Sequence, residues 1–140
     1  MLMSGQDYRD SLRRYQPRVY VNGRQIESVA DEPLLAPGVS GVALTYDFAL
    51  RQDVAALMRA SRPDLAGGQP VNRMIAIPAT TEDLLDKLEA VRLVCQEAGC
   101  AQRYLGGDAL AAIRQATARV DADLGTVYGE RFLVYLERVY

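Results

Sequence analysis

Apolar residues recur at helical spacing along most of the chain, most clearly in its second half. Thr80 and Asp83 have the spacing of an N-terminal capping box, and apolar residues then follow at intervals of four, three, four and three. This stripe consists of Leu84, Leu88, Val91, Cys95 and Ala98. Because residues at this spacing share one face of an α-helix, the pattern predicts a long helix packed through that face.

A second stripe follows after Gly106 and Gly107, which interrupt the helical pattern. We expect the chain to break at this glycine pair and Asp108 to cap the next helix. The stripe ends where Gly125 terminates it. Its members are Leu110, Ile113, Thr117, Val120 and Leu124.

The first half of the chain predicts shorter elements. Ser4 and Asp7 have capping-box spacing and precede an amphipathic helix that stops before Pro17. Residues 18–29 carry β-branched residues around Asn22-Gly23, and this pattern predicts a small β-hairpin. A loop over 30–38, helices near 39–50 and 53–60, an irregular stretch over 61–72 and an extended segment over 73–78 complete this half.

The last segment, residues 130–140, is apolar around most of its helical circumference. A helix of this kind requires burial on nearly all sides. Either it docks against another chain or it is a central core helix, and the sequence favours neither. The residues predicted for a partner interface are Phe132, Leu133, Leu136, Val139 and Tyr140.

Composition limits the classes of function. The 140 residues predict one globular domain with a net charge of −2. Basic residues are scattered, which argues against binding to nucleic acid or to a membrane surface. The N-terminus turns polar at once, unlike a signal peptide, so we expect a cytoplasmic protein with reduced thiols.

The sequence contains no histidine, which excludes imidazole from acid–base, nucleophile-activating and metal-binding roles. Lys87 is the one lysine and lies among four acidic residues, so a desolvated Schiff-base amine is disfavoured. Cys95 and Cys100 are five residues apart, about 140° around a helix. They therefore cannot jointly hold one metal ion from an unbroken helix, and the residues alone indicate two buried or half-buried thiols and no metal site.

Several segments resemble a known family. The opening "YRDSLR" at residues 8–13, the hairpin with its Asn-Gly turn, the "TYD" at 45–47 and "CAQRYLGGDAL" at 100–110 are similar to the N-terminal region of the 4-hydroxyphenylacetate 3-hydroxylase / 4-hydroxybutyryl-CoA dehydratase family. The similarity extends through the whole chain and is nearer the dehydratase branch. It implies an acyl-CoA dehydrogenase-like architecture of which residues 1–140 form the mainly α-helical N-terminal domain, without the middle β domain and the C-terminal helical bundle.

The resemblance also implies what has changed near Cys100. In the dehydratase branch two cysteines four residues apart are ligands of a [4Fe–4S] cluster, and here these positions are Cys100 and Tyr104. Tyrosine is not a ligand of that kind, so we expect no iron–sulfur cluster. In the hydroxylase branch an arginine and a tyrosine in this region hold the phenol, and neither is recognisable in the stretch around Gly107 and Asp108.

Two functions follow as expectations. The first is a small subunit of a split flavin-dependent enzyme, with FAD bound by a larger partner chain of the same family and hydroxylation preferred over dehydration. Cys100, Arg103, Tyr104 and Asp108 would then line the substrate pocket by position, Arg103 facing an anionic group and Tyr104 donating a hydrogen bond. A helix end with a solvated Arg103 and a packed Tyr104 explains the same residues. The second is a non-catalytic module that self-associates.

Overall fold

The computed structural model describes residues 2–61, 66–100 and 102–140, and most of them are helical. The helices are α1 (Gly5–Arg14), α2 (Ala36–Leu50), α3 (Ala55–Met58), α4 (Thr81–Ala98), α5 (Gln102–Leu124) and α6 (Tyr128–Val139). The other elements are β1 (Tyr20–Val21), β2 (Arg24–Gln25), β3 (Arg59–Ala60), the short 3₁₀ turn η1 (Ala66–Gly68) and β4 (Val71–Asn72).

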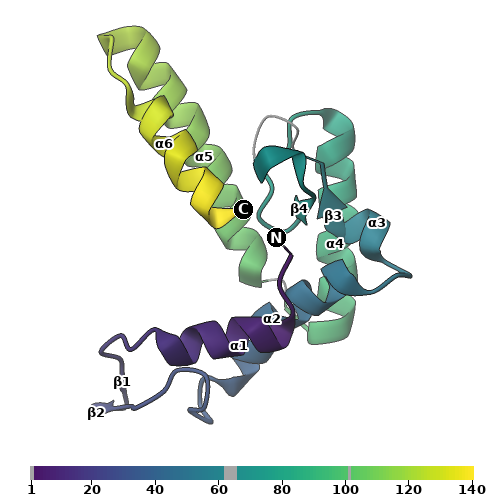
Figure 1. The fold of residues 1–140 in the computed structure, drawn as a ribbon, viewed down its shortest axis with the longest axis vertical. Coiled ribbons are helices and arrows are strands. Elements are labelled where there is room, and N and C mark those ends of the chain that lie inside the picture. Colours follow the sequence, from purple (N-terminus) through teal and green to yellow (C-terminus); the bar gives the residue numbers. More distant parts are fainter. Residues whose placement is uncertain (1, 62–65, 101) are drawn as a thin grey trace.

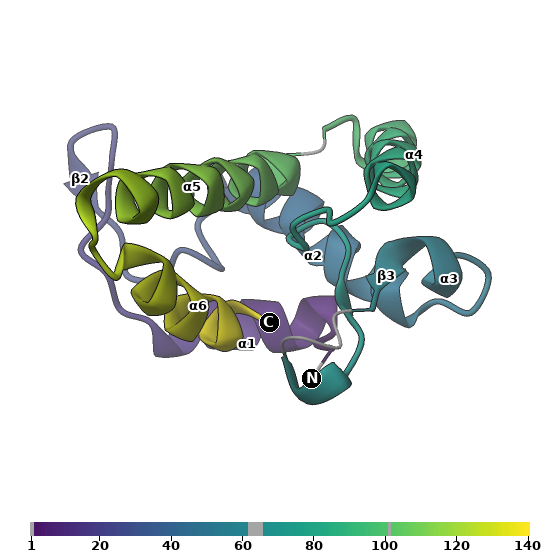
Figure 2. The same ribbon diagram turned by 90° about the horizontal axis from the view of Figure 1, so that it is seen from above.

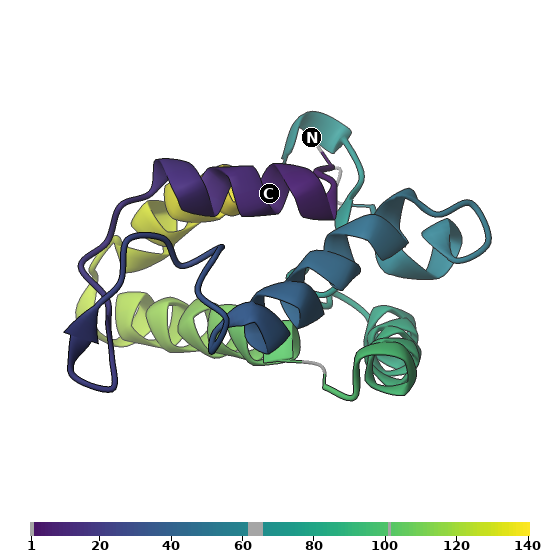
Figure 3. The same ribbon diagram turned by 90° about the horizontal axis from the view of Figure 1, so that it is seen from below.

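Helix α2 is the central element of the fold. It contacts α1, α3, α4 and α5, and α5 with α6 forms a hairpin that leans away from α4 (Figure 1). Viewed from above, α4 lies apart from that hairpin, on the other side of α2 (Figure 2). From below, α1 runs beside α2 (Figure 3). The arrangement leaves α4 and the α5–α6 hairpin covered by this chain on one side only.

Local signals at the N-terminus are confirmed. The Ser4 hydroxyl accepts a hydrogen bond from the Asp7 amide at 3.0 Å, and the Asp7 carboxylate accepts one from the Ser4 amide at 2.9 Å. Asn22 and Gly23 take positive φ angles of 50° and 77° in the turn between the antiparallel strands β1 and β2. The Asp47 carboxylate on α2 accepts a hydrogen bond from the Gly5 amide at 2.7 Å and so ties α1 to α2.

The region between α3 and α4 differs from its prediction. Strands β3 and β4 pair antiparallel, which the sequence did not indicate, and residues 62–65 of the predicted irregular stretch lie outside the described part. The extended segment predicted over 73–78 is wrong. Asn72 ends the strand because its side-chain oxygen accepts a hydrogen bond from the Met74 amide at 3.0 Å, which turns the chain.

The break predicted at Gly106-Gly107 is also wrong. Helix α4 begins with the predicted capping box at Thr80 and ends at Gly99, whose φ is 68°. Helix α5 then runs without interruption through both glycines. Gly107 is a close approach: a Cβ placed on it would lie 2.6 Å from Lys87 Nζ and would also collide with the Met74 carbonyl oxygen. The absence of a side chain at Gly107 allows α5 to pack directly against the turn that contains Met74.

Helix α4 packs through a different face from the one predicted. Lys87, Ala90 and Val94 are its buried residues. Leu84, Leu88 and Cys95 of the predicted stripe are exposed, and so is Cys100, which corrects the expectation of buried thiols. The small Ala90 and Val94 permit close packing in the core beside α2 and α3, while the leucine face has no cover within the described chain.

Two apolar clusters make up most of the core. The first joins α2, α3 and α4 to the turn after β4, and the second joins α5 and α6 to the segment before α4. The first cluster contains Phe48, Ala49, Met58, Met74, Ala90 and Val94. The second contains Ile77, Leu110, Phe132 and Leu136. These clusters fix the position of α5 relative to α2 and α4.

Helix α6 is neither a fully buried core helix nor a fully exposed docking helix, because one of its faces is buried and another is exposed. Phe132 and Leu136 are buried within the chain, whereas Leu133 is 40% exposed, and Val134 and Tyr135 are exposed with it. Its N-terminus is held by Asp121 of α5. That carboxylate accepts hydrogen bonds from the Tyr128 amide at 2.8 Å, the Gly129 amide at 2.7 Å and the Thr126 hydroxyl at 2.6 Å.

Removing Asp121 should loosen the α5–α6 hairpin. We expect Asp121→Ala to lower the urea midpoint of unfolding, because three donors lose their acceptor, while Asp123→Ala two residues away should leave it nearly unchanged. Hydrogen bonds from Thr126 and the Gly129 amide lower the pKa of Asp121 below 3.8. The carboxylate therefore contributes stability above that value. The difference in urea midpoint between Asp121→Ala and the wild type should disappear as the pH falls through the folded-state pKa. Equal midpoints for both variants at pH 7 would contradict this role.

The two adjacent glycines of α5 provide a second matched test. Gly107→Ala should destabilise the fold by about 1–3 kcal/mol, because the new Cβ meets the Met74 carbonyl oxygen and Lys87 Nζ. Gly106→Ala meets nothing within 4 Å and should stabilise by about 0.5–1 kcal/mol through helix propensity. Urea unfolding followed by circular dichroism measures both. A helix broken at the pair would instead give two similar losses.

Candidate functional site

A small cavity with a volume of about 50 Å³ lies where α2, α5 and the two chain ends meet. Tyr46 of α2 and Arg103 of α5 contribute its polar wall together with Asn72. Val139 and Tyr140 at one end of the chain and Leu2 and Met3 at the other line it as well. The two ends lie near one another in Figures 1 and 2. The cavity therefore depends on the tertiary fold rather than on any one motif.

Arg103 is the charged residue of this cavity. Its Nη1 donates a hydrogen bond to Thr45 Oγ1 at 2.8 Å, and its Cζ lies 3.8 Å from the centroid of the Tyr46 ring. Tyr46 in turn stacks on Tyr8 of α1, with ring centroids 5.2 Å apart. Burial lowers the pKa of Arg103, which still carries its charge at neutral pH. The guanidinium is thus held in one orientation by α2 and is not a solvated helix end.

Tyr104 points to a different group of residues from its neighbour Arg103. Its ring centroid is 5.6 Å from Lys87 Nζ of α4, and its hydroxyl forms a hydrogen bond with the Asp108 side chain one turn along α5. Burial raises the pKa of Tyr104, and the nearby Asp108 charge and their hydrogen bond raise it further. The phenol therefore stays protonated at neutral pH and donates its one proton to the Asp108 carboxylate.

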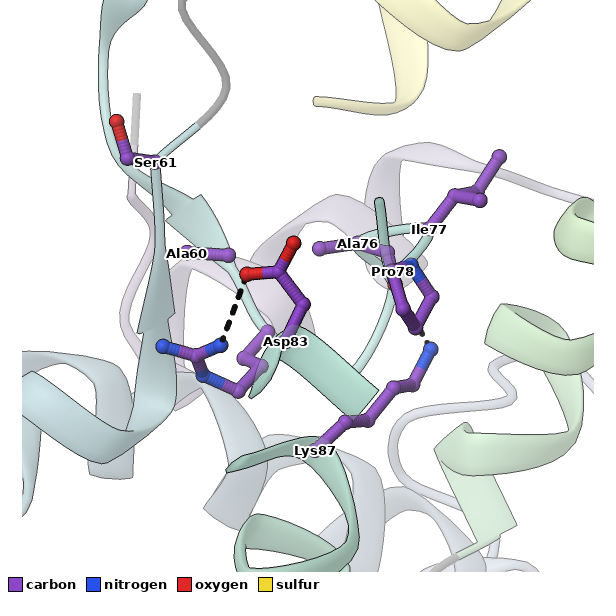
Figure 4. A pocket seen from close by; sticks show the side chains of 8 residues that line it. Ala60, Ser61, Ala76, Ile77, Pro78, Asp83 and Lys87 are labelled. Atoms are coloured by element: carbon purple, nitrogen blue, oxygen red, sulfur yellow. Dashed lines mark hydrogen bonds and ion pairs between the residues drawn. The ribbon is translucent and has the colours of Figure 1, made fainter. Parts of the chain in front are cut away.

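Lys87 is the residue that the sequence reasoning missed. Its side chain is 2% exposed, although four acidic residues surround it in the sequence. Nζ donates a hydrogen bond to the Ala76 carbonyl oxygen at 2.8 Å (Figure 4). Burial lowers the pKa of Lys87, and the charge of Asp108 partly opposes this effect. Nothing in the sequence indicates that Lys87 is buried, because the hydrophobic pattern assigned the buried face of α4 to the leucines.

The hollow beside Lys87, drawn in Figure 4, is too small for a substrate. Its volume is about 10 Å³, about that of one water molecule. Arg73 lines it and forms an ion pair with Asp86 at 3.1 Å, while its Nε donates to the Leu57 carbonyl oxygen at 2.6 Å. These contacts join β4 to α3 and α4. We assign this hollow a structural role.

The predicted pocket residues thus fall into two groups. Arg103 lines the 50 Å³ cavity, whereas Tyr104 and Asp108 meet Lys87. Cys100 is exposed in the link between α4 and α5. This set does not fit the two-thiolate pair that the resemblance implies for the dehydratase branch, because the second position is a phenol engaged with Asp108. Within residues 2–61, 66–100 and 102–140 no group of three or more cysteine, aspartate or glutamate side chains is placed to hold a metal ion.

Within the same described ranges, no helix combines the length and the apolar character needed to cross a membrane.

Comparison with known proteins agrees with the family resemblance. Residues 4–140 match the family described as 4-hydroxyphenylacetate 3-hydroxylase N terminal. The chain is 36% identical, over 140 residues, to the 4-hydroxybutyryl-CoA dehydratase/vinylacetyl-CoA-Delta-isomerase of Clostridium aminobutyricum. The match covers 99% of this chain and 28% of that protein. The chain therefore spans little more than a quarter of the length of this relative.

Among the solved structures, a dehydratase is more similar to this chain than HpaB is. An oxygen-tolerant archaeal 4-hydroxybutyryl-CoA dehydratase from N. maritimus superposes with a TM-score of 0.89 at 36% identity, over 99% of this chain and 27% of that one. A mutant of HpaB complexed with FAD gives a TM-score of 0.57 at 21% identity, over 68% of this chain and 19% of that one, and shows the fold alone. The mainly helical, N-terminal-domain fold predicted from sequence is confirmed.

These comparisons correct one part of the sequence-based function. The subunit of a flavin-dependent enzyme was expected to favour hydroxylation, but the relatives at 36% identity are dehydratases and the FAD-bound HpaB is only distantly similar. The preference for a monooxygenase is therefore wrong. The chain belongs to the 4-hydroxyphenylacetate 3-hydroxylase N-terminal family, and within it resembles the 4-hydroxybutyryl-CoA dehydratases.

Proposed function

We propose that this domain forms the N-terminal wall of the substrate site in a flavin-dependent enzyme that removes water from an acyl-CoA thioester. The observation that carries the proposal is the 36% identity and TM-score of 0.89 to the archaeal dehydratase through 99% of the chain. A likeness of that extent includes the link before α5 and the first turns of α5, where Cys100, Arg103 and Tyr104 lie. It supports a shared reaction class more strongly than the distant match to HpaB does.

Within such a site the chain's own residues bind and orient. Arg103, held by Thr45 and Tyr46, presents a fixed positive charge toward the cavity. The Tyr104 hydroxyl directs its one proton to Asp108, so toward a substrate it offers its lone pairs and can accept a hydrogen bond from a substrate hydroxyl. Both groups are placed on one rigid helix, so their separation does not change when substrate arrives.

A flavin bound beside this wall would supply electron transfer to and from the substrate. We propose that other domains of the same family hold it, as the resemblance implies, because the cavity beside Arg103, at about 50 Å³, is too small for a flavin. The donor set at Cys100 and Tyr104 does not fit an iron–sulfur cluster, and we propose that this site operates without one at these two positions.

We also propose which surfaces meet those domains. Leu84, Leu85 and Leu88 form an exposed face of α4, on which Leu85 is 61% exposed. Leu133 and Val134 form a second exposed face on α6. Apolar faces of this kind are typical of interfaces that are covered in the assembled protein. Of the interface residues predicted from sequence, Leu133 is exposed, Val139 and Tyr140 are half-buried, and Phe132 and Leu136 pack inside the chain.

The test is isolation of the tagged chain from its own organism with whatever it binds. We expect recovery of a flavin-containing complex that removes water from 4-hydroxybutyryl-CoA and does not hydroxylate 4-hydroxyphenylacetate. Product analysis of both assays by mass spectrometry, with the untagged strain as control, gives the readout. A complex that hydroxylates 4-hydroxyphenylacetate, or a colourless self-associated chain without either activity, would refute the proposal.

A further inference from the structure

We propose that the cavity beside Arg103 binds a carboxylate group attached to an aliphatic chain. The proposal goes beyond the proposed function: the acyl group of an acyl-CoA thioester has no free carboxylate, so the ligand of this cavity is a separate aliphatic acid. Its basis is a fixed, desolvated guanidinium that faces a cavity and has no acidic partner among the residues that the structure describes.

The charge of Arg103 is not neutralised by its neighbours. Its hydrogen-bond acceptor is the neutral Thr45 hydroxyl, which itself donates to the Val42 carbonyl oxygen at 2.7 Å. Its stacking partner is the neutral Tyr46 ring. Asp47, the acidic residue next to Tyr46, accepts the hydrogen bond from the Gly5 amide. By contrast, Arg73 has Asp86 at 3.1 Å. A half-buried cation without a counter-charge is less favourable than a paired one, so the site favours an anion.

The donors that remain on Arg103 favour a carboxylate. The guanidinium is a planar fork, and with Nη1 committed to Thr45 its other N–H groups remain to bind a planar anion. Five of the residues that line the cavity are Leu2, Met3, Ile75, Val139 and the ring of Tyr140, and these favour a carboxylate carried on an alkyl chain over inorganic phosphate, which has no apolar part. Because Tyr46 fixes the plane of the guanidinium, little side-chain entropy is lost on binding.

The rest of the cavity suits an alkyl chain. Leu2, Ile75 and Val139 also line the cavity, and their side chains are apolar. Asn72 does not compete for the anion, because its Nδ2 donates to the Thr45 carbonyl oxygen at 2.7 Å and its Oδ1 accepts from the Met74 amide. One charged wall and one apolar wall together select an amphiphilic acid over inorganic anions.

The test is a ¹H–¹⁵N NMR titration of the 140-residue chain with butyrate, butyramide and inorganic phosphate. We expect saturable shifts from butyrate at Thr45, Asn72 and Arg103, with millimolar affinity. Butyramide has the same shape without the charge and should bind at least about tenfold more weakly, as phosphate should. Arg103→Gln should weaken butyrate binding by about tenfold or more, while Arg119→Gln, an exposed arginine on the same helix, should leave it unchanged.

The comparison of the three ligands uses the unaltered chain, so it stands even if Arg103→Gln fails to fold. Equal binding of butyrate and butyramide would overturn the inference, as would tighter binding of phosphate or shifts confined to other residues. Absence of butyrate binding would also overturn it while leaving the proposed function intact, because that function is measured by turnover of the complex. If the complex does not turn over 4-hydroxybutyryl-CoA but the chain binds butyrate as expected, the proposed function is refuted and the inference about the cavity stands.

Discussion

The close contact of α5 with the turn after β4 is the constraint on which the arrangement of the site depends. Gly107 lies against the Met74 carbonyl oxygen and Lys87 Nζ, where any side chain would collide. This contact brings the first turns of α5 between α2 and α4. Arg103 then faces Tyr46 on one side, and Tyr104 faces Lys87 on the other. Two adjacent residues of one helix thereby serve two different environments, a cavity and a buried polar cluster.

Local signals made the fold class and several boundaries predictable, including the capping boxes at Ser4 and Thr80 and the Asn22-Gly23 turn. The errors arose where tertiary contacts override local pattern. A glycine pair is the same in sequence whether it breaks a helix or permits close packing, and only the approach of Met74 distinguishes the two. Likewise, the predicted stripe of α4 has correct helical spacing, but this chain covers the neighbouring face, which carries Lys87, Ala90 and Val94. Arg103 and Tyr104 were predicted by position, whereas Lys87 was not, because its burial depends on Ala76 and Gly107.

The comparisons and the side chains describe different aspects of the protein. Similarity over 99% of the chain connects the domain with dehydratases of its family. The residues at the start of α5 show how this domain departs from the pattern that the resemblance implies, with a phenol held by Asp108 in place of a second thiolate. The Tyr104 hydroxyl donates to Asp108, while Arg103, without a counter-charge, has N–H groups left to bind oxygen atoms.

The most direct test of this account is X-ray diffraction from crystals of the native complex, measured on both sides of the iron absorption edge. The account predicts no anomalous iron peak next to Cys100 and Tyr104, with the Tyr104 hydroxyl bonded to the Asp108 carboxylate and Lys87 buried beside the ring. An iron peak within bonding distance of Cys100, with Tyr104 displaced from Asp108, would contradict it. That result would mean that the domain completes a metal centre with ligands from other parts of the complex.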